Sequence, residues 1–403
     1  MSVTVQSRPR ENRYCRPEME LILACCRNAR DPAAEDAVLQ KVNSGVDWDL
    51  LVELMEFHGV TLVVGRKLSV IGSSRVPENL LERSRCWEIE AARQNLGQTV
   101  ELLRIIELLQ EGGVEVIPFR GMALAAQLYG ELTVRQSSDI DLIIRQQDVL
   151  TVKRILSSAG YAPPSCLSPA QEAAFVRVAC VYELWNRDRK VRLELHWKDS
   201  QHVALPLPDN FVWKGSQFTS FGGRQVRTLA QETLLLLLCA HGTKHCWQQL
   251  RYVSDVAELV RLSRDIDWVR LLRKADELGA RSMVMTGLGL SHQVLGAPVP
   301  DEVMRDIRNN RQAQRIVAEC SKVFFDGCQT EPGYWRTCQF NLRSFDKWGG
   351  RFRYLTRVAL RPGIQDFKAA SLPKFLFPLY PCIRLLRLIR ILLARPSQTA
   401  AGH

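Results

Sequence analysis

The sequence predicts an α+β protein in which a short α/β segment is flanked by helical segments on both sides. Apolar residues recur at helical spacing from Glu78 to Gln110, and a strongly apolar helix begins at Leu229. Between these stretches, short runs such as Asp139 to Ile144 and Val191 to Trp197 alternate polar and apolar residues with the period of a strand. Long helices around a few short strands indicate this fold class.

The order of these elements divides the chain into five parts. Residues 1–15 are polar and basic without periodic apolar positions, so we expect disorder there. Residues 16–111 form an N-terminal helical segment, in which Asp47 is a helix N-cap. Residues 112–228 form the α/β core, residues 229–300 a helical domain that closes a cleft, and residues 301–403 a C-terminal helical region.

Strands and helices are expected to alternate within the core. The expected elements are a strand at Val114 to Phe119, a helix at Gly121 to Tyr129, a strand at Asp139 to Ile144 and a helix at Gln147 to Ala159. The segments Phe175 to Trp185 and Val191 to Trp197 are expected to form a β-hairpin around a turn at Asn186 to Arg189.

Two carboxylates stand on one face of the second expected strand. Because side chains alternate along a strand, Asp139 and Asp141 share a face while Ile140 and Leu142 point to a core. Neighbouring carboxylates repel one another unless a cation lies between them, and hard oxygen ligands suit Mg²⁺. The pattern indicates metal-assisted phosphoryl chemistry; an exposed strand that carries two aspartates for solubility is the alternative interpretation.

A third acid strengthens the metal interpretation. Glu194 and His196 share one face of the strand Val191 to Trp197, so the Glu194 carboxylate could complete a cage with the aspartates. His196 is expected either to orient Glu194 or contact substrate, or to be a structural histidine hydrogen-bonded within the sheet.

Basic and glycine residues surround these acids. Gly121 stands at a strand-to-helix junction, where backbone N–H groups approach a phosphate, or where the chain needs only a tight turn. Arg120 and Arg135 flank the acids and could neutralise a triphosphate, with a solvated arginine as the alternative for Arg135. His241, Lys244 and His245 share a helix face, but this segment lacks the glutamate of a zinc-protease motif.

These motifs together resemble a known family. The relevant segments are Arg120-Gly-Met-Ala-Leu124, Arg135-Gln-Ser-Ser-Asp-Ile-Asp-Leu142, Glu194-Leu-His-Trp197 and Ala240-His-Gly-Thr-Lys-His245. In order and spacing they resemble the bacterial uncharacterised nucleotidyltransferases of the polymerase-β-like nucleotidyltransferase superfamily, over residues 20–300. The chain departs from that pattern at Arg120, where lysine is usual, and at Met122, where the wider superfamily has a second small residue.

The resemblance implies a polymerase-β-like core with a small mixed sheet, and transfer of a nucleoside monophosphate from an NTP to an acceptor with release of pyrophosphate. It implies that Asp139, Asp141 and Glu194 are the catalytic and metal-binding residues, with two Mg²⁺ ions as cofactor. The substrate-binding residues would be Arg120, Gly121, Arg135, His196 and Lys244, with Lys244 across the cleft. The acceptor is open between a small molecule, a sugar, a tRNA end and a protein; the rival function is a non-catalytic nucleotide-binding or scaffolding protein.

Most of the net positive charge of the chain lies near its C-terminus. Of 54 Lys/Arg and 43 Asp/Glu residues, ten basic residues and one acid fall within residues 351–403, so the rest of the chain is nearly neutral. The twelve cysteines form no C-x-x-C pair, which argues against a zinc cage and favours reduced thiols. The polar, basic start from Met1 to Pro17 is unlike a signal peptide. A cytoplasmic protein is therefore expected.

The tail at residues 375–395 has its own pattern. From Ile383 onward a short helix is expected, too short to span a bilayer. A helical wheel puts Arg384, Arg387, Arg390 and Arg395 on one side and leucines and isoleucines on the rest. The tail is expected either to lie on an anionic membrane surface, as in an adaptor at the inner membrane, or to pack its leucines on the protein's own body. A partner protein and nucleic-acid phosphates are the remaining alternatives.

Overall fold

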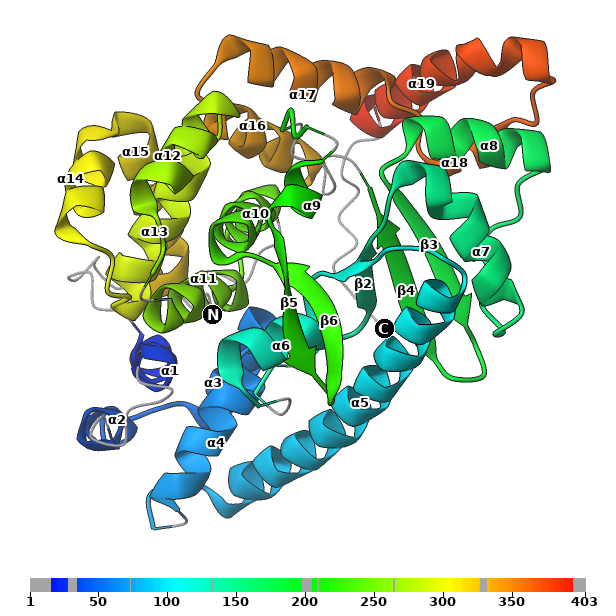
Figure 1. The fold of residues 1–403 in the computed structure, drawn as a ribbon. Helices are drawn as coiled ribbons and strands as arrows, with labels where there is room; N and C mark the ends of the chain where they lie inside the picture. The colour runs from blue at the N-terminus through cyan, green and yellow to red at the C-terminus, as the bar shows by residue number, and fades with distance from the viewer. Residues whose placement is uncertain are drawn as a thin grey trace, which may run out of the picture.

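The computed structural model describes residues 16–27, 35–72, 74–131, 134–135, 137–197, 205–208, 210–263, 265–326 and 332–393. The disorder expected for residues 1–15 lies outside these described residues. Figure 1 shows a small central sheet with helices on both sides of it.

Helices precede and follow the sheet. The N-terminal ones are α1 (Pro17–Arg27), α2 (Glu35–Val42), α3 (Trp48–His58), α4 (Thr61–Ile71) and α5 (Glu78–Glu111). Those after the sheet are α10 (Gln231–Lys244), α11 (Leu250–Leu262), α12 (Trp268–Glu277), α13 (Arg281–Leu295), α14 (Asp301–Asn309) and α15 (Arg311–Asp326). The predicted N-cap is present at α3, where the Asp47 side chain accepts from Asp49 N and Leu50 N.

The central sheet is mixed and has the strand order β1-β2-β4-β3. Its strands are β1 (Ile117–Pro118), β2 (Ile140–Ile143), β3 (Val181–Asn186) and β4 (Val191–His196), and the helices among them are α6 (Gly121–Tyr129), α7 (Val149–Ser157) and α8 (Pro169–Val178). β2 runs parallel to β4, whereas β1 and β3 are antiparallel to their neighbours. The predicted α+β class, a small mixed sheet flanked by helical segments, is confirmed.

The predicted hairpin is present but begins later than expected. β3 and β4 pair as a hairpin, yet Phe175 to Val178, predicted as strand, belong to α8. A capping box explains the difference: Gln171 N donates to Ser168 Oγ, and Ser168 N donates to the Gln171 side chain. Pro169 at the first helical position reinforces this start.

Two hydrophobic cores lie on the two sides of the sheet. The first joins α1–α4 and the start of α5 with α10–α15, so the N-terminal helices pack beside α13 rather than on the sheet (Figure 1). The second joins the sheet face of Ile140, Leu142, Leu193 and Leu195 with α6–α8 and the C-terminal half of α5. The opposite sheet face therefore points toward α10.

The C-terminal region crosses from the first core to the second. Its helices are α16 (Tyr334–Ser344), α17 (Trp348–Leu360), α18 (Ile364–Ala369) and α19 (Tyr380–Leu393), with a 3-10 turn η3 (Lys374–Leu379). Phe345 and Tyr354 pack in the first core, and Phe367 and Tyr380 in the second. No helix in the described part of the chain is long and apolar enough to cross a bilayer.

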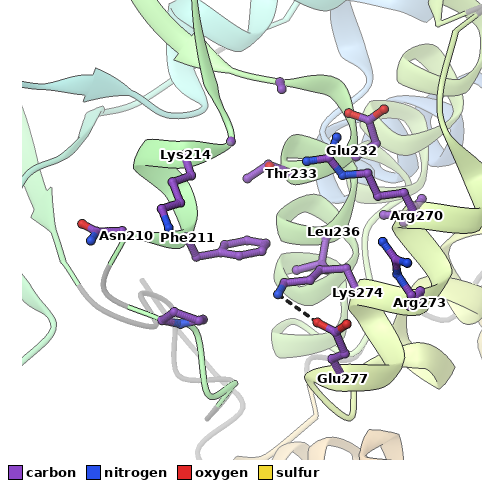
Figure 2. Close-up of a pocket in the computed structure, with 14 residues that line it drawn as sticks. Asn210, Phe211, Lys214, Glu232, Thr233, Leu236, Arg270, Arg273, Lys274 and Glu277 are labelled. Atoms are coloured by element: carbon purple, nitrogen blue, oxygen red, sulfur yellow. Dashed lines mark hydrogen bonds and ion pairs between the residues drawn. The ribbon is translucent and has the colours of Figure 1, made fainter.

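A cavity of about 530 Å³ lies between α9 (Phe211–Lys214), α10 and α12 (Figure 2). Lys274 extends across it, with its Nζ 2.9 Å from Glu277 Oε2 and 5.6 Å from the centre of the Phe211 ring. β5 (Ser216–Phe221) and β6 (Arg224–Leu229) form a hairpin beside it. None of the acids selected from the sequence lines this cavity, so we place the reaction elsewhere.

The first core contains one group that makes stability sensitive to pH. His58 is fully buried next to Phe57 and Phe324, and neither ring nitrogen has a hydrogen-bond partner among the described residues. Burial lowers the pKa of His58 to about 4.

We predict that acid destabilises the protein through His58. Below its unfolded-state pKa of about 6.5, the unfolded chain binds a proton that the folded protein excludes until its own pKa is reached. Lowering the pH from about 7.5 to 5 should therefore remove about 2 kcal/mol from the free energy of unfolding through this group. His58→Phe should remove that part of the pH dependence in denaturant titrations; an unchanged pH dependence would contradict the assignment.

Candidate active site

The register of β2 against β4 brings two predicted acids together. In this parallel pair Asp141 lies opposite Glu194, and Ile143 lies opposite His196. Since alternate residues share a face, Asp141, Glu194 and His196 all point to the side of the sheet that faces α10, while Leu193 and Leu195 fill the second core. The predicted convergence of acids from two strands therefore follows from strand pairing.

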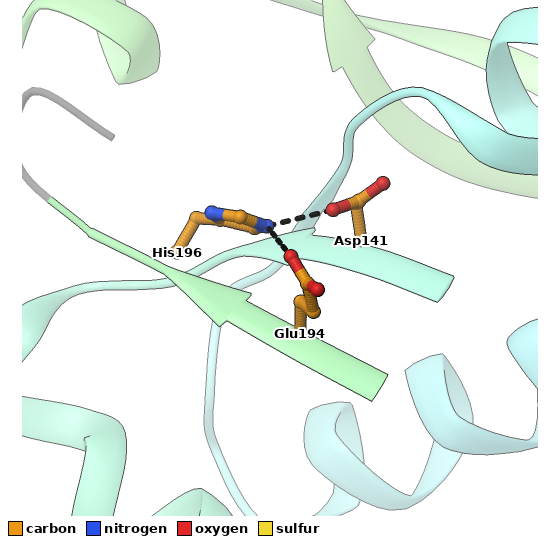
Figure 3. Close-up of side chains that lie close together, drawn as sticks. All are labelled: Asp141, Glu194 and His196. Atoms are coloured by element: carbon orange, nitrogen blue, oxygen red, sulfur yellow. Dashed lines mark hydrogen bonds and ion pairs between the residues drawn. The ribbon is translucent and has the colours of Figure 1, made fainter. Parts of the chain in front are cut away.

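Figure 3 shows how the three side chains meet. His196 Nε2 lies 2.7 Å from Asp141 Oδ1 and 3.4 Å from Glu194 Oε2. One nitrogen or oxygen of each residue lies within 4.8 Å of the others, an arrangement able to hold a metal ion. Asp141 and His196 are buried, whereas Glu194 is partly exposed, so Glu194 is the member of the cluster that faces solvent.

Arg120 completes the cluster from the junction between β1 and α6. Its Nη2 donates to Asp141 Oδ1 at 2.6 Å. The Arg120 backbone has φ 68° and ψ −151°, a region that residues other than glycine rarely occupy and that costs about 1–3 kcal/mol. Strain of this kind persists only where surrounding contacts enforce it, and here the ion pair to Asp141 is such a contact.

The same guanidinium connects the sheet to α10. Arg120 Nη1 lies 2.9 Å from His241 Nε2. Because arginine can only donate, His241 must accept this hydrogen bond and is therefore neutral. Burial, followed by the nearby Arg120 charge, holds the pKa of His241 well below its ordinary value, in agreement with that assignment. His245 lies beside His241 and stacks on Tyr252, which gives it a packing role.

The charges in the cluster are strongly coupled. Burial alone would raise the pKa of Asp141, but Arg120 and the hydrogen bond from His196 outweigh it and lower this pKa to about 2. Burial also opposes protonation of His196, yet its bonds to Asp141 and Glu194 raise its pKa. The hydrogen bond from His196 lowers the pKa of Glu194. The cluster thus joins two carboxylates to an arginine and a histidine through hydrogen bonds.

Asp139 lies at the edge of this cluster. It is half-buried just before β2 and does not belong to the group of three whose ligand atoms converge among the described residues. Burial, and then the charges of Asp141 and Glu194, raise the pKa of Asp139. Asp139 is therefore close enough to feel both carboxylates, and its role as metal ligand and catalytic residue stays a prediction.

Gly121 and Arg135 shape the backbone next to the acids. Gly121 has φ +51°, and a Cβ there would lie 3.2 Å from the Asp139 carbonyl oxygen, so a tight approach of two backbone segments requires glycine. Arg135 Nε and Nη2 donate to Asp255 on α11 at 3.0 and 3.2 Å, and Nη1 donates to the Gly121 carbonyl. Arg135 is therefore mostly buried in an ion pair rather than solvated, and substrate contact by either residue stays a prediction.

Lys244 approaches the cluster from the C-terminal end of α10. It is half-buried, and its Nζ forms no ion pair with a described residue. Burial, and then the charge of Arg120, lower the pKa of Lys244, while Glu194 and Asp141 oppose this shift. The lysine therefore lies within electrostatic reach of the acids from across the gap between sheet and helices, as its predicted role requires.

The residues present fit a divalent cation. Asp141 and Glu194 offer hard oxygen ligands and His196 an imidazole nitrogen. Burial, and then the charges of Asp141 and Glu194, raise the pKa of Asp139, so this third carboxylate lies within electrostatic reach of the other two. Two of the three predicted ligands, Asp141 and Glu194, belong to the group whose ligand atoms converge. In that group His196 takes the place of Asp139.

Some residues of the site were not selected from the sequence. Arg192 on β4 donates from Nη2 to Glu194 Oε1 at 3.2 Å, which orients that carboxylate. Asp255 on α11 forms the ion pair with Arg135. A helical wheel could have identified Asp255 as significant, because it lies on the buried face of α11 with Tyr252, Val256 and Leu259.

Comparisons with known proteins agree with the motifs. The family model described as "Uncharacterised nucleotidyltransferase" matches residues 44–296, more than half of the 403 residues. No curated protein matches. A matching solved structure is the solution structure of the antibiotic-resistance factor ANT(2'')-Ia, with 14% identity, 56% of this chain and 96% of that chain covered, and a TM-score of 0.29, too low to carry an argument. On the family match, the chain belongs to the uncharacterised nucleotidyltransferase family.

Proposed function

We propose that the protein is a metal-dependent nucleotidyltransferase that moves a nucleoside monophosphate from an NTP to an acceptor and releases pyrophosphate. The observation that carries this proposal is the pairing of Asp141 with Glu194 on adjacent parallel strands, next to His196. In a member of a nucleotidyltransferase family, this converging acid cluster is the place where a divalent ion and a triphosphate would meet.

The residues have distinct tasks in this proposal. Glu194, the partly exposed acid, accepts the proton of the attacking acceptor oxygen, and Arg192 and His196 hold its carboxylate in place. The acceptor oxygen forms a bond to the α-phosphorus while the bond from that phosphorus to pyrophosphate breaks. Arg120 and Lys244 balance phosphate charge from the two sides of the gap. Asp139, Asp141 and Glu194 would hold Mg²⁺, which supplies acidification of the acceptor and charge stabilisation of the leaving group.

The rival function is a non-catalytic nucleotide-binding or scaffolding protein. The complete set of three acids favours catalysis, since binding alone has no need for a partly exposed carboxylate beside the metal ligands. Incubating a cell extract with the protein, Mg²⁺ and α-labelled NTPs, followed by mass spectrometry, tests for nucleotide-modified species. Their absence with every NTP would favour the rival.

A second candidate role, peripheral attachment to an anionic membrane, rests on the outer surface of the C-terminal helices. α17 and α19 pack side by side at the upper edge of Figure 1. Large apolar side chains there remain exposed, among them Trp348 (79%), Phe352 (68%), Phe375 (78%) and Leu386 (62%).

The charge of this surface complements anionic lipid. Within the described residues 347–393 the one acid is Asp366, which is fully buried and paired with Arg384 and Arg387. These two arginines therefore face the protein and not the outside, which differs from the basic stripe expected from the helical wheel. Exposed Arg353, Lys374 and Arg390 accompany the apolar side chains. We propose that this surface lies on the cytoplasmic face of the inner membrane, because exposed apolar groups favour lipid over nucleic acid.

We predict that Asp141→Asn abolishes nucleotide transfer. The substitution removes the charge that Arg120 and His196 neutralise, so it should also lower the free energy of unfolding by about 1–3 kcal/mol. Label transfer and denaturant titration measure the two effects separately. Asp188→Asn, in the exposed turn between β3 and β4, is the matched control and should change neither. Retained transfer by Asp141→Asn would remove this carboxylate from the mechanism.

Lys244→Ala should weaken binding of an NTP more than binding of the corresponding NMP, since the lysine is proposed to contact the outer phosphates. Isothermal titration calorimetry with Mg²⁺ measures both, and we expect roughly a tenfold loss for the triphosphate. Lys214→Ala, an exposed lysine at the cavity of Figure 2, should leave both affinities unchanged. Equal weakening of NTP and NMP would place Lys244 away from the outer phosphates.

The full-length protein should co-sediment with phosphatidylglycerol–phosphatidylcholine vesicles at low salt and remain in the supernatant with pure phosphatidylcholine. Replacing Trp348 and Phe352 together by Asp should abolish sedimentation, because it removes apolar contact and adds negative charge. Val269→Asp, at an equally exposed apolar site on α12, is the control and should sediment like the wild type. A wild-type protein that stays in the supernatant would refute membrane attachment.

A further inference from the structure

A large cavity opens beside the acid cluster on one side. Its volume is about 910 Å³, and it touches the cluster through Glu194 and His196. Residues of β3 form its floor, including Val181 and Glu183. Neither Gly121 nor Asp141 is among its lining residues. It therefore lies toward the β4–β3 edge of the sheet, whereas the β1–α6 junction with Gly121 belongs to the other edge.

This placement distinguishes two substrate positions. In the proposed function, the NTP phosphates lie between Arg120, at the β1–α6 junction, and Lys244 on α10, where the cavity begins. The cavity reaches the cluster at Glu194, the carboxylate that accepts the proton of the acceptor. A second substrate in this cavity would therefore present its reacting oxygen to Glu194.

The C-terminal region supplies the remaining walls. α16 and α17 pack in the first core, α18 and α19 in the second, and the link at residues 361–363 lines the cavity between them. Asn341 Nδ2 donates to the Lys244 carbonyl at 3.5 Å, and Gln171 Nε2 donates to Tyr380 Oη at 3.0 Å. The wall is thus attached to both α10 and α8. All of it lies beyond the family match, which ends at residue 296.

Positive charge predominates around this cavity. Besides Lys244, which the proposed function assigns to the NTP, the basic lining residues are Arg357, Arg361, Lys368 and Arg384, against the acids Glu183 and Glu194. Arg384 shares its charge with Asp366, at 3.5 Å, but the balance stays positive without it. A cavity with such lining attracts anions and repels cations. Tyr334 and Tyr354 add aromatic surface suited to the organic part of a small molecule.

We propose that this cavity binds the acceptor, and that the acceptor is a small phosphate-bearing molecule whose phosphate contacts the C-terminal basic wall. This inference rests on the proposed function, since it assigns the second substrate of that reaction. The guanidinium groups of Arg357 and Arg361 and the ammonium of Lys368 are donors that suit phosphate. The C-terminal region thereby determines acceptor specificity, while the family segment carries the acids of the transfer step.

The experiment compares a phosphorylated and an uncharged probe of the same skeleton, without NTP or metal. Isothermal titration calorimetry of the full chain should detect glycerol 3-phosphate and give no binding heat for glycerol. Lys368 is exposed and forms no ion pair with a described residue, so Lys368→Gln should leave the fold intact. It should raise the Kd of glycerol 3-phosphate roughly tenfold. Lys322→Gln, an exposed lysine on α15 outside the cavity, is the control and should bind like the wild type.

Failure of this inference is separable from failure of the proposed function. Asp141→Asn should still bind glycerol 3-phosphate, because the cavity does not include Asp141. Binding without nucleotide transfer by the wild type would overturn the function and leave the anion site standing. Equal heats for glycerol and glycerol 3-phosphate, or an equal Kd for the Lys368 and Lys322 variants, would overturn the anion site.

Discussion

The buried charge of Asp141 constrains the arrangement of the whole site. A carboxylate removed from water costs several kcal/mol unless opposite charge and hydrogen bonds replace the water. Arg120 provides these from the β1–α6 junction, and His196 provides them from β4. Arg120 also binds His241 on α10. Through this arginine, the Asp141 carboxylate therefore helps to fix the position of the sheet relative to the helical body. The strained backbone at Arg120 is the cost of that geometry.

Local periodicity was enough to predict which acids share a face, but not which strands are neighbours. Asp139 with Asp141, and Glu194 with His196, follow from the two-residue period of a strand. The parallel pairing of β2 with β4 is a contact between segments far apart in the chain, and no local pattern specifies it. The pairing of Arg135 with Asp255 is non-local in the same way. Such contacts depend on which apolar faces are buried together, and this is decided by the whole chain.

The predicted segment boundaries describe the order of the elements but not their packing. The N-terminal helices share a core with α10–α15, from which the α/β core separates them in sequence. α5 connects the two cores, with Leu80 and Leu81 in the first and Leu102 to Leu109 reaching the second. The helical spacing of its apolar residues was visible in the sequence. The change from one core to the other along the helix was not, because the apolar residues that pack in either core recur with the same helical period.

The tail shows how one buried acid can reverse an interpretation based on a helical wheel. The wheel placed Arg384 and Arg387 on an outward basic stripe, but Asp366 on α18 binds both and turns them inward, on the same side of α19 as the buried Leu388. Arg390 stays exposed, and Arg395 lies outside the described residues. Asp366 thus resembles Asp141, since each is a buried carboxylate bound by two basic side chains from other elements. Asp366 is the one acid within residues 347–393, and its negative charge is matched inside the protein, so the region has a net positive charge. The excess positive charge of the chain therefore lies both along the cavity wall beside Glu194 and on the outer surface with the exposed apolar side chains.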